Sequence, residues 1–366
     1  MSATSELRAL TSMRGIAAWM VVLYHIRLSI AGLSTAWVHF FAKGYLAVDF
    51  FFLLSGFVIW MRWSDRLRAG GWHDISSFLQ KRVARIWPLH LFVLSGAVAL
   101  ALALAAAGRQ NPVEFPLREL PLHLMLLQNW GFTNRLSWND PAWSISCEFA
   151  AYLAFLLLVR VVDWRTVPSG LVVGSAAAFL VILAAAMANQ PSLGHDIAHF
   201  GLVRCLTEFA AGSAICALWV RWNAAPTWPA LFSLGLTIAM LLAWTSGVSE
   251  QCAIPFAFAG LLLAIALTSE LRWNPLTWPP LHYLGEISYA TYLSHYMLFV
   301  AFKLVFVDDA RAIPPILIGV YVAIVLGGSV ALCHLVERPA QRWVSRLPLP
   351  IGRRRRTGTK PATAHS

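Results

Sequence analysis

Long apolar segments recur along the chain, and short polar or mixed stretches separate them. Apolar runs of about 17–25 residues can cross a hydrocarbon layer about 30 Å thick as α-helices. Ten spans are predicted, at residues 9–30, 44–62, 86–107, 142–162, 169–188, 202–220, 229–246, 252–268, 287–306 and 313–336. The runs lack a strict two-residue alternation, so they do not suit a membrane barrel. The pattern predicts an all-α, polytopic membrane protein with about ten transmembrane helices.

Composition agrees with this pattern. Of the 366 residues, 58% are hydrophobic and 12% are charged, whereas an ordinary soluble domain has about 25% charged residues. A soluble enzyme and a disordered chain are therefore excluded. Residues 1–346 are predicted to form a single transmembrane domain, followed by a basic, disordered cytoplasmic tail at 347–366. The apolar piece 120–127 is too short to span and predicts an interfacial or re-entrant element.

The basic residues predict the orientation of the chain. An even number of spans puts both termini on one side, and 20 of the 28 Lys and Arg residues fall on that side. Cytoplasmic loops carry the excess of Lys and Arg, so both termini are predicted to be cytoplasmic. The net charge of +11 thus reflects membrane orientation and contact with membrane lipids, and no nucleic-acid partner is expected.

Three acid–base groups are predicted at similar depth in the outer half of the membrane. His25 lies late in the first span, Asp49 near the start of the second and Glu148 near the start of the fourth. Ionisable groups within spans are costly, so they usually face a cavity or a partner. The alternative is a structural hydrogen-bond cluster between helices. Arg14 lies eleven residues before His25, which places both side chains on one helical face.

Two further polar groupings stand out. Arg82 and Arg85, at i and i+3, form a pair that suits phosphate oxygens, although anionic lipid headgroups would be bound in the same way. Ser288, Tyr292 and His295 form a polar stripe at i, i+4 and i+7 on an otherwise apolar span, which predicts a lined passage or a polar helix contact. The sequence has no metal-binding or nucleotide-loop motif, so no metal site is predicted.

Several of these residues lie in segments that resemble the integral-membrane acyltransferase family 3, whose members O-acylate sugars of envelope glycans. The matching segments are Arg14–Ala18 with His25, Gly44–Phe57, Arg82–Arg85, Trp143–Glu148, Ser288–His295 and Glu337–Pro339. Two departures are visible. Ala47 replaces a common second glycine, and Phe149 replaces a frequent second acid, which leaves Glu148 as the sole carboxylate of its segment.

The resemblance implies a bacterial inner-membrane O-acyltransferase with no permanently bound cofactor. Its co-substrate would be a cytoplasmic acyl-CoA, most often acetyl-CoA, and its acceptor a hydroxyl of a glycan or glycolipid. Arg14, Arg82 and Arg85 would hold the CoA phosphates. His25 would act as general base or transient acyl carrier.

The same resemblance leaves some roles open. Either Glu148 or Asp49 would orient the imidazole of His25. Ser288, Tyr289, Tyr292 and His295 would line the channel, with hydroxyl groups able to stabilise an oxyanion. The sequence pattern does not specify the acceptor sugar, the acyl length or the oligomeric state.

Two other classes fit the apolar architecture. A transporter or flippase for lipid-linked sugars would also have many spans and buried charges, but the sequence shows no inverted half-repeats. A non-catalytic partner in glycan assembly would use its polar residues structurally.

Overall fold

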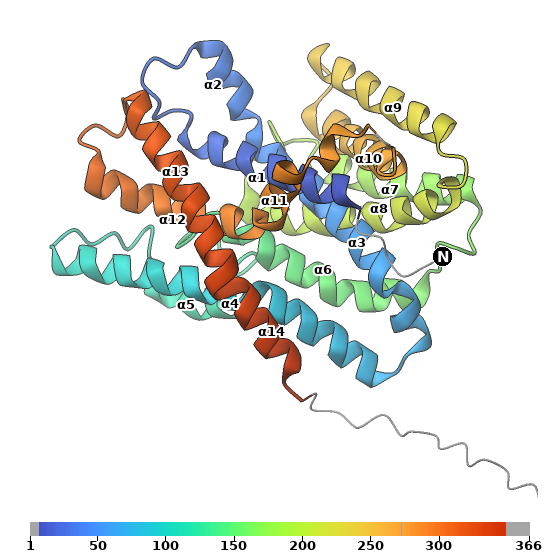
Figure 1. Ribbon diagram of the computed structural model, residues 1–366, viewed down its shortest axis with the longest axis horizontal. Coiled ribbons are helices and arrows are strands. Elements are labelled where there is room, and N and C mark those ends of the chain that lie inside the picture. Colours follow the sequence, from blue (N-terminus) through green and yellow to red (C-terminus); the bar gives the residue numbers. More distant parts are fainter. Residues whose placement is uncertain (1–6, 272, 349–366) are drawn as a thin grey trace, which may run out of the picture.

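The computed structural model describes residues 7–271 and 273–348, and within them the chain is helical with no named strand (Figure 1). The α-helices are α1 Arg8–Ile26, α2 Thr35–Ala42, α3 Ala47–Ala69, α4 Trp72–Ala106, α5 Leu120–Met125, α6 Ala142–Val161, α7 Ser169–Ala186, α8 Ile197–Trp222, α9 Thr227–Thr245, α10 Glu250–Thr268, α11 Pro279–Glu286, α12 Ser288–Phe306, α13 Pro315–Leu332 and α14 Arg338–Arg346. Short helices are η1 Gly44–Leu46, η2 Leu117–Glu119, η3 Pro275–Thr277 and the π-helical η4 Cys333–Glu337.

The helical membrane architecture predicted from the sequence is confirmed. Within the described ranges, nine helical stretches are long and apolar enough to cross a membrane. The ninth predicted span forms α12, which carries the polar stripe and is not among these nine. The short apolar piece at 120–127 forms the six-residue helix α5 and does not span.

Proline residues mark the starts of several helices. Pro141, Pro168, Pro226 and Pro314 immediately precede α6, α7, α9 and α13. The ring fixes φ near the helical value, and the missing N–H group would have no partner at a helix start. The local sequence therefore sets where these helices begin.

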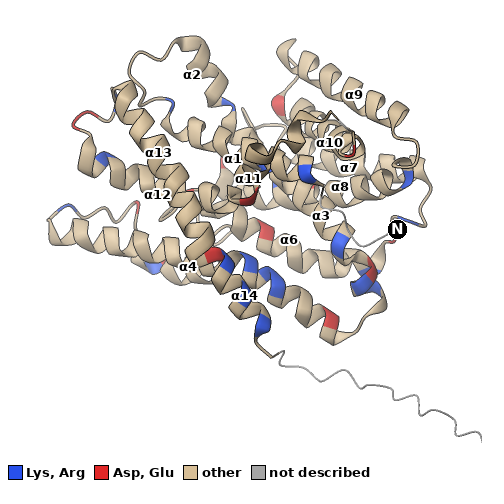
Figure 2. Ribbon diagram, viewed as in Figure 1, with Lys and Arg blue, Asp and Glu red and all other residues tan. Residues whose placement is uncertain are grey.

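One face of the bundle gathers the loops that the sequence assigns to the cytoplasm, and we call it the inner face. Arg68 lies 3.3 Å from Asp163, which follows α6. Arg221, at the end of α8, donates 2.7 Å to the carbonyl of Trp164. Gln80 of α4 donates 2.7 Å to the carbonyl of Leu347, beside α14. Figure 2 shows Lys and Arg gathered on α4 and α14, where the two helices cross.

The opposite face gathers the other loops and is called the outer face. The amide of Ile313 donates 2.7 Å to the carbonyl of Ser29, which ties the loop before α13 to the end of α1. Lys43 lies 2.8 Å from Glu250, at the start of α10, and the amide of Leu193 donates 2.9 Å to the same carboxylate. The predicted grouping of loops into two faces agrees with these contacts.

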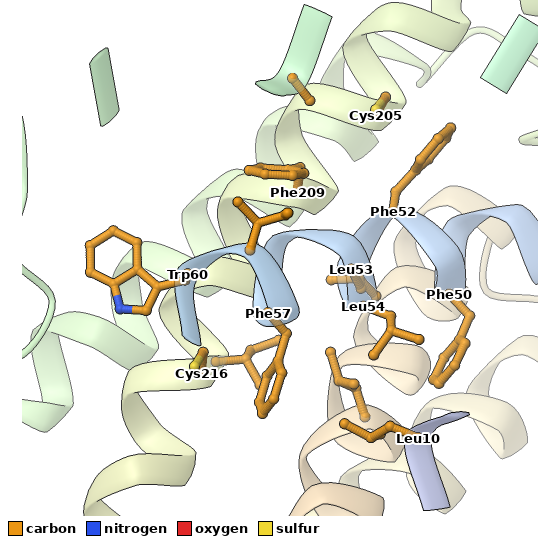
Figure 3. Close-up of a cluster of buried hydrophobic side chains, with 14 of the residues drawn as sticks. Leu10, Phe50, Phe52, Leu53, Leu54, Phe57, Trp60, Cys205, Phe209 and Cys216 are labelled. Atoms are coloured by element: carbon orange, nitrogen blue, oxygen red, sulfur yellow. The ribbon is translucent and has the colours of Figure 1, made fainter. Parts of the chain in front are cut away.

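Helices α3 and α8 approach each other so closely that only glycine fits at two positions. A Cβ atom on Gly56 would lie 1.9 Å from the carbonyl oxygen of Phe209, and one on Gly212 would lie 1.9 Å from that of Leu53. Small residues permit this kind of helix contact in membranes. Large apolar side chains of α3, among them Phe57, pack around the contact (Figure 3).

Two helices differ from the predicted spans. Helix α4 begins at Trp72, well before the predicted border at residue 86, because its polar first turns pack against α14 outside the apolar segment. The last predicted span is interrupted by the π-helical η4, a feature that often occurs at functional sites. Of the predicted tail at 347–366, residues 349–366 lie outside the described residues.

Candidate active site

A cavity of about 160 Å³ opens between α1, α3, α4, α6 and α12 and is called the arginine cavity. Three basic side chains line it: Arg14 from α1 and Arg82 and Arg85 from α4. Most of the remaining wall is apolar, with side chains such as Phe51 and Ile145. The three arginines that the sequence assigns to the donor thus lie around one cavity. The site combines positive charge with an apolar passage.

Two of the three arginines are available to a ligand. Arg85 forms an ion pair with Glu337, which is 2% exposed and belongs to η4. Arg14 forms no hydrogen bond or ion pair with any residue between 7 and 348 that the structure describes. Arg82 contacts the rings of Phe78 and Tyr152, with its guanidinium carbon 6.0 and 5.7 Å from the ring centres. Guanidinium groups without a carboxylate partner suit the phosphates of an anionic ligand.

Glu148 belongs to the wall of the arginine cavity. It accepts a hydrogen bond of 2.5 Å from the hydroxyl of Ser55 and one of 2.6 Å from that of Tyr152. Its carboxylate makes no contact with His25. The prediction that Glu148 and His25 lie together is wrong, because α6 directs Glu148 towards α3 and the arginines.

Asp49 also lies apart from His25. Its two oxygens accept hydrogen bonds of 2.8 Å each from Nη2 of Arg204, and Nε of Arg204 donates a third at 3.1 Å. Both side chains are buried, with exposed fractions of 0% for Asp49 and 1% for Arg204. Tertiary packing brings α8 against α3, so the carboxylate binds an arginine and not the imidazole. The predicted convergence of Asp49 with His25 is therefore wrong.

His25 instead contacts His295 and Asp140. Its Nδ1 atom lies 3.2 Å from Nε2 of His295, and its Nε2 atom lies 3.7 Å from Oδ2 of Asp140. His295 is fully buried, His25 is 14% exposed and Asp140 is 35% exposed. We call His25 and His295 the imidazole pair. Together with the carboxylate of Asp140 they lie at the outer end of α1.

The hydrogen bonds fix the tautomers of the imidazole pair. Nδ1 of His295 lies 2.8 Å from the carbonyl of Tyr292 and 3.1 Å from that of Thr291, so it carries a proton and donates. Nε2 of neutral His295 is then an acceptor, and Nδ1 of His25 donates to it and to the carbonyl of Val21 at 3.0 Å. Nε2 of His25 therefore keeps a lone pair, which is what a general base requires.

Tyr292 lies between the arginine cavity and the imidazole pair. Its side chain lines the cavity, and its ring centre is 6.2 Å from that of His295. Its hydroxyl lies 2.7 Å from that of Ser144 and donates 3.2 Å to the carbonyl of Pro141. Neither histidine lines the cavity. The cavity therefore ends at the Ser144–Tyr292 hydrogen bond.

Ser288 and Tyr289 lie at the end of the cavity close to the arginines. Ser288 lines it while donating 2.7 Å to the carbonyl of Gly285, and Tyr289 donates 2.7 Å to that of Ile86. The guanidinium of Arg85 lies 5.1 Å from the Tyr289 ring centre. The predicted channel residues of α12 thus follow the cavity from Ser288 to Tyr292, and His295 continues the line beyond it.

Two residues of the site were missed in the sequence. Asp140 lies three positions before Trp143, at the outer border of the fourth predicted span. The argument that an ionisable group at this depth faces a cavity or a partner applies to Asp140 as it does to Glu148. Arg204 lies near the start of the sixth predicted span, at residues 202–220. An arginine at membrane depth usually faces a cavity or a partner such as a carboxylate, and that signal could have assigned Asp49 to it.

Comparison with known proteins bears on the chemistry of this site. The acyltransferase domain of acyltransferase family 3 matches residues 7–334. Acyltransferase MdmB of Streptomyces mycarofaciens is 31% identical over 98% of this chain and 96% of its own length. The chain belongs to acyltransferase family 3. Its arginine cavity and imidazole pair therefore lie in an acyltransferase, and this favours acyl transfer over sugar transport.

Two other relatives match over about half of their own length. The putative peptidoglycan O-acetyltransferase YrhL of Bacillus subtilis (strain 168) is 26% identical over 80% of this chain, which spans 48% of the YrhL sequence. Protein 2 in the picA locus of Rhizobium radiobacter is 33% identical over 29% of the chain and 51% of its own length. No solved structure matches the chain significantly.

Proposed function

We propose that this acyltransferase moves an acetyl group from acetyl-CoA, bound from the inner face, to a hydroxyl of a glycan or glycolipid presented at the outer face. The observation that carries the proposal is the layout along α1. Arg14 lines the arginine cavity, and His25, eleven residues later and about 16 Å along the helix axis, carries a lone pair at the other end. The name of YrhL supports an acetyl group and a glycan acceptor.

The arginine cavity would bind the donor. Among the described residues, Arg14 and Arg82 have no carboxylate partner, which leaves their guanidinium groups to bind the phosphates of CoA. The apolar wall suits the pantetheine arm and excludes water from the thioester. Glu148, held by Ser55 and Tyr152, would shape the wall and not touch the reacting atoms.

His25 would perform the proton transfer. The acceptor oxygen attacks the thioester carbonyl while its proton moves to Nε2 of His25, and the C–S bond then breaks as the imidazolium returns the proton to the thiolate. The bond from Nδ1 of His25 to His295 fixes the tautomer needed for the first step. Asp140, 3.7 Å from Nε2, stabilises the positive charge after proton uptake.

The thioester must pass Tyr292 to meet His25, because this side chain closes the cavity. Displacement of its ring breaks the hydrogen bond to Ser144 and leaves two hydroxyl donors beside the reacting carbonyl. Both can stabilise the oxyanion of the tetrahedral intermediate. We place this enzyme in the bacterial inner membrane with its inner face and termini towards the cytoplasm, in line with the distribution of Lys and Arg.

The test is a transfer assay on purified protein in lipid nanodiscs. Labelled acetyl-CoA is supplied with a panel of glycans, and covalent label on the glycan is measured for the wild type, His25→Ala and the control His195→Ala. His195 lies in an outer loop, and its imidazole Nδ1 lies 2.6 Å from Oε1 of Gln190. We expect the first substitution to abolish transfer and the control to retain it. Turnover by folded His25→Ala would overturn the proposal.

A further inference from the structure

A second, smaller cavity lies beside the imidazole pair, at the outer face. Its volume is about 10 Å³, and the residues around it include His123, Gln128, Asn129, Asn139 and Asp140. We call it the amide pocket. It is large enough for one hydroxyl group or water molecule and too small for a sugar ring. Because Asp140 also contacts His25, the pocket adjoins the reacting centre.

Three of the residues that line the amide pocket carry side-chain amides, Gln128, Asn129 and Asn139. The NH₂ groups of Gln128, Asn129 and Asn139 donate to the carbonyls of Ala142, Ile197 and Leu293 at 3.2, 3.1 and 2.9 Å.

A carbonyl can only accept, so these contacts fix the orientation of each amide. The three amide oxygens are buried and have no hydrogen-bond partner in the described chain. The side chains are 4%, 1% and 2% exposed, in the order Gln128, Asn129, Asn139.

His123 adds a fourth acceptor. Ser137 donates its hydroxyl proton to Glu119 at 3.0 Å, so its oxygen accepts the proton on Nε2 of His123, also at 3.0 Å. Burial, together with the nearby charge of His90, lowers the pKa of His123 to about 3. The ring is neutral at physiological pH, and its Nδ1 atom is a buried acceptor without a partner.

Buried acceptors left without donors are costly, and four around one small cavity call for a ligand that donates hydrogen bonds. We propose that the amide pocket binds one hydroxyl group of the glycan acceptor, next to the hydroxyl that becomes acylated. This assignment rests on the proposed function and specifies how the acceptor is recognised. The sugar ring lies outside the pocket, against the half-exposed Asp140, with its neighbouring hydroxyl directed towards Nε2 of His25.

Such a pocket would make the enzyme selective among acceptors. A site whose acceptors need donors binds a polyol and rejects an analogue that lacks the inserted hydroxyl, because the buried oxygens then stay unpaired. An apolar or carboxylate-bearing acceptor would meet the same penalty. The inserted hydroxyl donates its one proton to one of these acceptors, so the pocket selects for a compound that carries a hydroxyl at that position.

The experiment compares kinetics of Gln128→Met and Asn139→Leu with those of Gln251→Met. Gln251 is a matched control, since it is a buried amide whose NH₂ group donates to the carbonyls of Met187 and Gln190, remote from the pocket lining. The donor is labelled acetyl-CoA, and the acceptor is the glycan that gives the highest rate in the panel described above. Thermal unfolding in detergent reports whether each variant is folded.

We expect the KM for the glycan to rise about tenfold or more in the two pocket variants, with the KM for acetyl-CoA unchanged. A glycan KM equal to that of Gln251→Met would overturn the assignment and leave the pocket as a site for ordered water only. Absence of transfer by the wild type to every glycan would instead refute the proposed function.

A second measurement tests the proposal even if the pocket variants fail to fold. Monodeoxy analogues of the same glycan are tested on the wild type, and removal of one particular hydroxyl should lower kcat/KM about tenfold or more. In a folded pocket variant, removal of that hydroxyl should lower kcat/KM little further, because the substitution and the removal delete the same interaction. Equal kcat/KM values for all deoxy analogues on the wild type would contradict the proposal.

Discussion

Nε2 of His25 lies 3.7 Å from Oδ2 of Asp140, a carboxylate two residues before the start of α6. The opposite nitrogen of the ring is 3.2 Å from His295. One neighbour thus fixes the tautomer and the other faces the nitrogen that would gain a proton. In the proposed mechanism, the two roles that a single carboxylate has in a hydrolytic triad would be divided between His295 and Asp140.

Replacing Asp140 by Asn should lower kcat for acetyl transfer by about 10²-fold or more, because the imidazolium of His25 loses its facing negative charge. The KM for acetyl-CoA should be unchanged, since Asp140 does not line the arginine cavity. Asp309→Asn is the control, because Asp309 lies in another outer loop and accepts a hydrogen bond from the amide of Arg311. Equal kcat values for the two variants would contradict the assignment.

Arg14→Ala and Arg82→Ala should each raise the KM for acetyl-CoA by about tenfold to a hundredfold and change kcat less, because each removes a charge-assisted phosphate contact. Steady-state kinetics with varied acetyl-CoA measures this. Lys81→Ala is the matched control, since Lys81 precedes Arg82 on α4, does not line the cavity and contacts the ring of Trp63. If the donor KM of all three variants matches the wild type, the arginines do not bind CoA.

Asp49→Asn should destabilise the protein by about 3–5 kcal/mol, because it leaves Arg204 buried without its counter-ion. The measurement is thermal unfolding in detergent. The double variant Asp49→Leu, Arg204→Met should recover much of the loss, since it removes both charges of the ion pair together. A single variant as stable as the wild type, or a double variant less stable than the single one, would show that the ion pair is not a structural element.

Acidification should lower the free energy of unfolding, through protonation of His123 at the outer face. Burial keeps its pKa at about 3 in the folded state, below the ordinary value of about 6.5. Protonation therefore favours the unfolded chain. The contribution of neutral His123 to the free energy of unfolding is complete above about pH 6.5. It is lost as the pH falls from there towards 3, with about 2 kcal/mol lost at pH 5.

The comparison that checks this is the change in unfolding temperature between pH 7 and pH 5. His123→Gln should show a smaller change than the wild type. His195→Gln should retain the wild-type change, because His195 is exposed in an outer loop. Identical pH dependence in all three proteins would mean that His123 is protonated in the folded state as readily as in the unfolded chain.

Several site residues could be assigned from the sequence because local spacing determines them. Arg82 and Arg85 are one helical turn apart, and Ser288, Tyr292 and His295 fall on one face of α12, whichever way the helices pack. Arg14 and His25 share a face of α1 for the same reason. These groups were expected at the site, and the structure brings them to the arginine cavity and to the imidazole pair.

The partners of the charged groups could not be assigned in this way. Asp49, Glu148 and Asp140 all lie at the outer ends of predicted spans, so depth alone does not distinguish them. Which of them meets His25 depends on the rotation of α3 and α6 about their axes. That rotation follows from contacts such as Gly56 against Phe209, which join residues more than a hundred positions apart.

By itself, the sequence determined that this chain is a helical membrane protein, which loops share a face, and which polar residues lie on each helix, because hydropathy and helical period are local properties. Only the tertiary structure decided that Asp140 faces His25, that Arg204 binds Asp49 and that Tyr292 closes the cavity. Those relationships depend on how separate helices pack, and packing is fixed by the side chains of every neighbour at once.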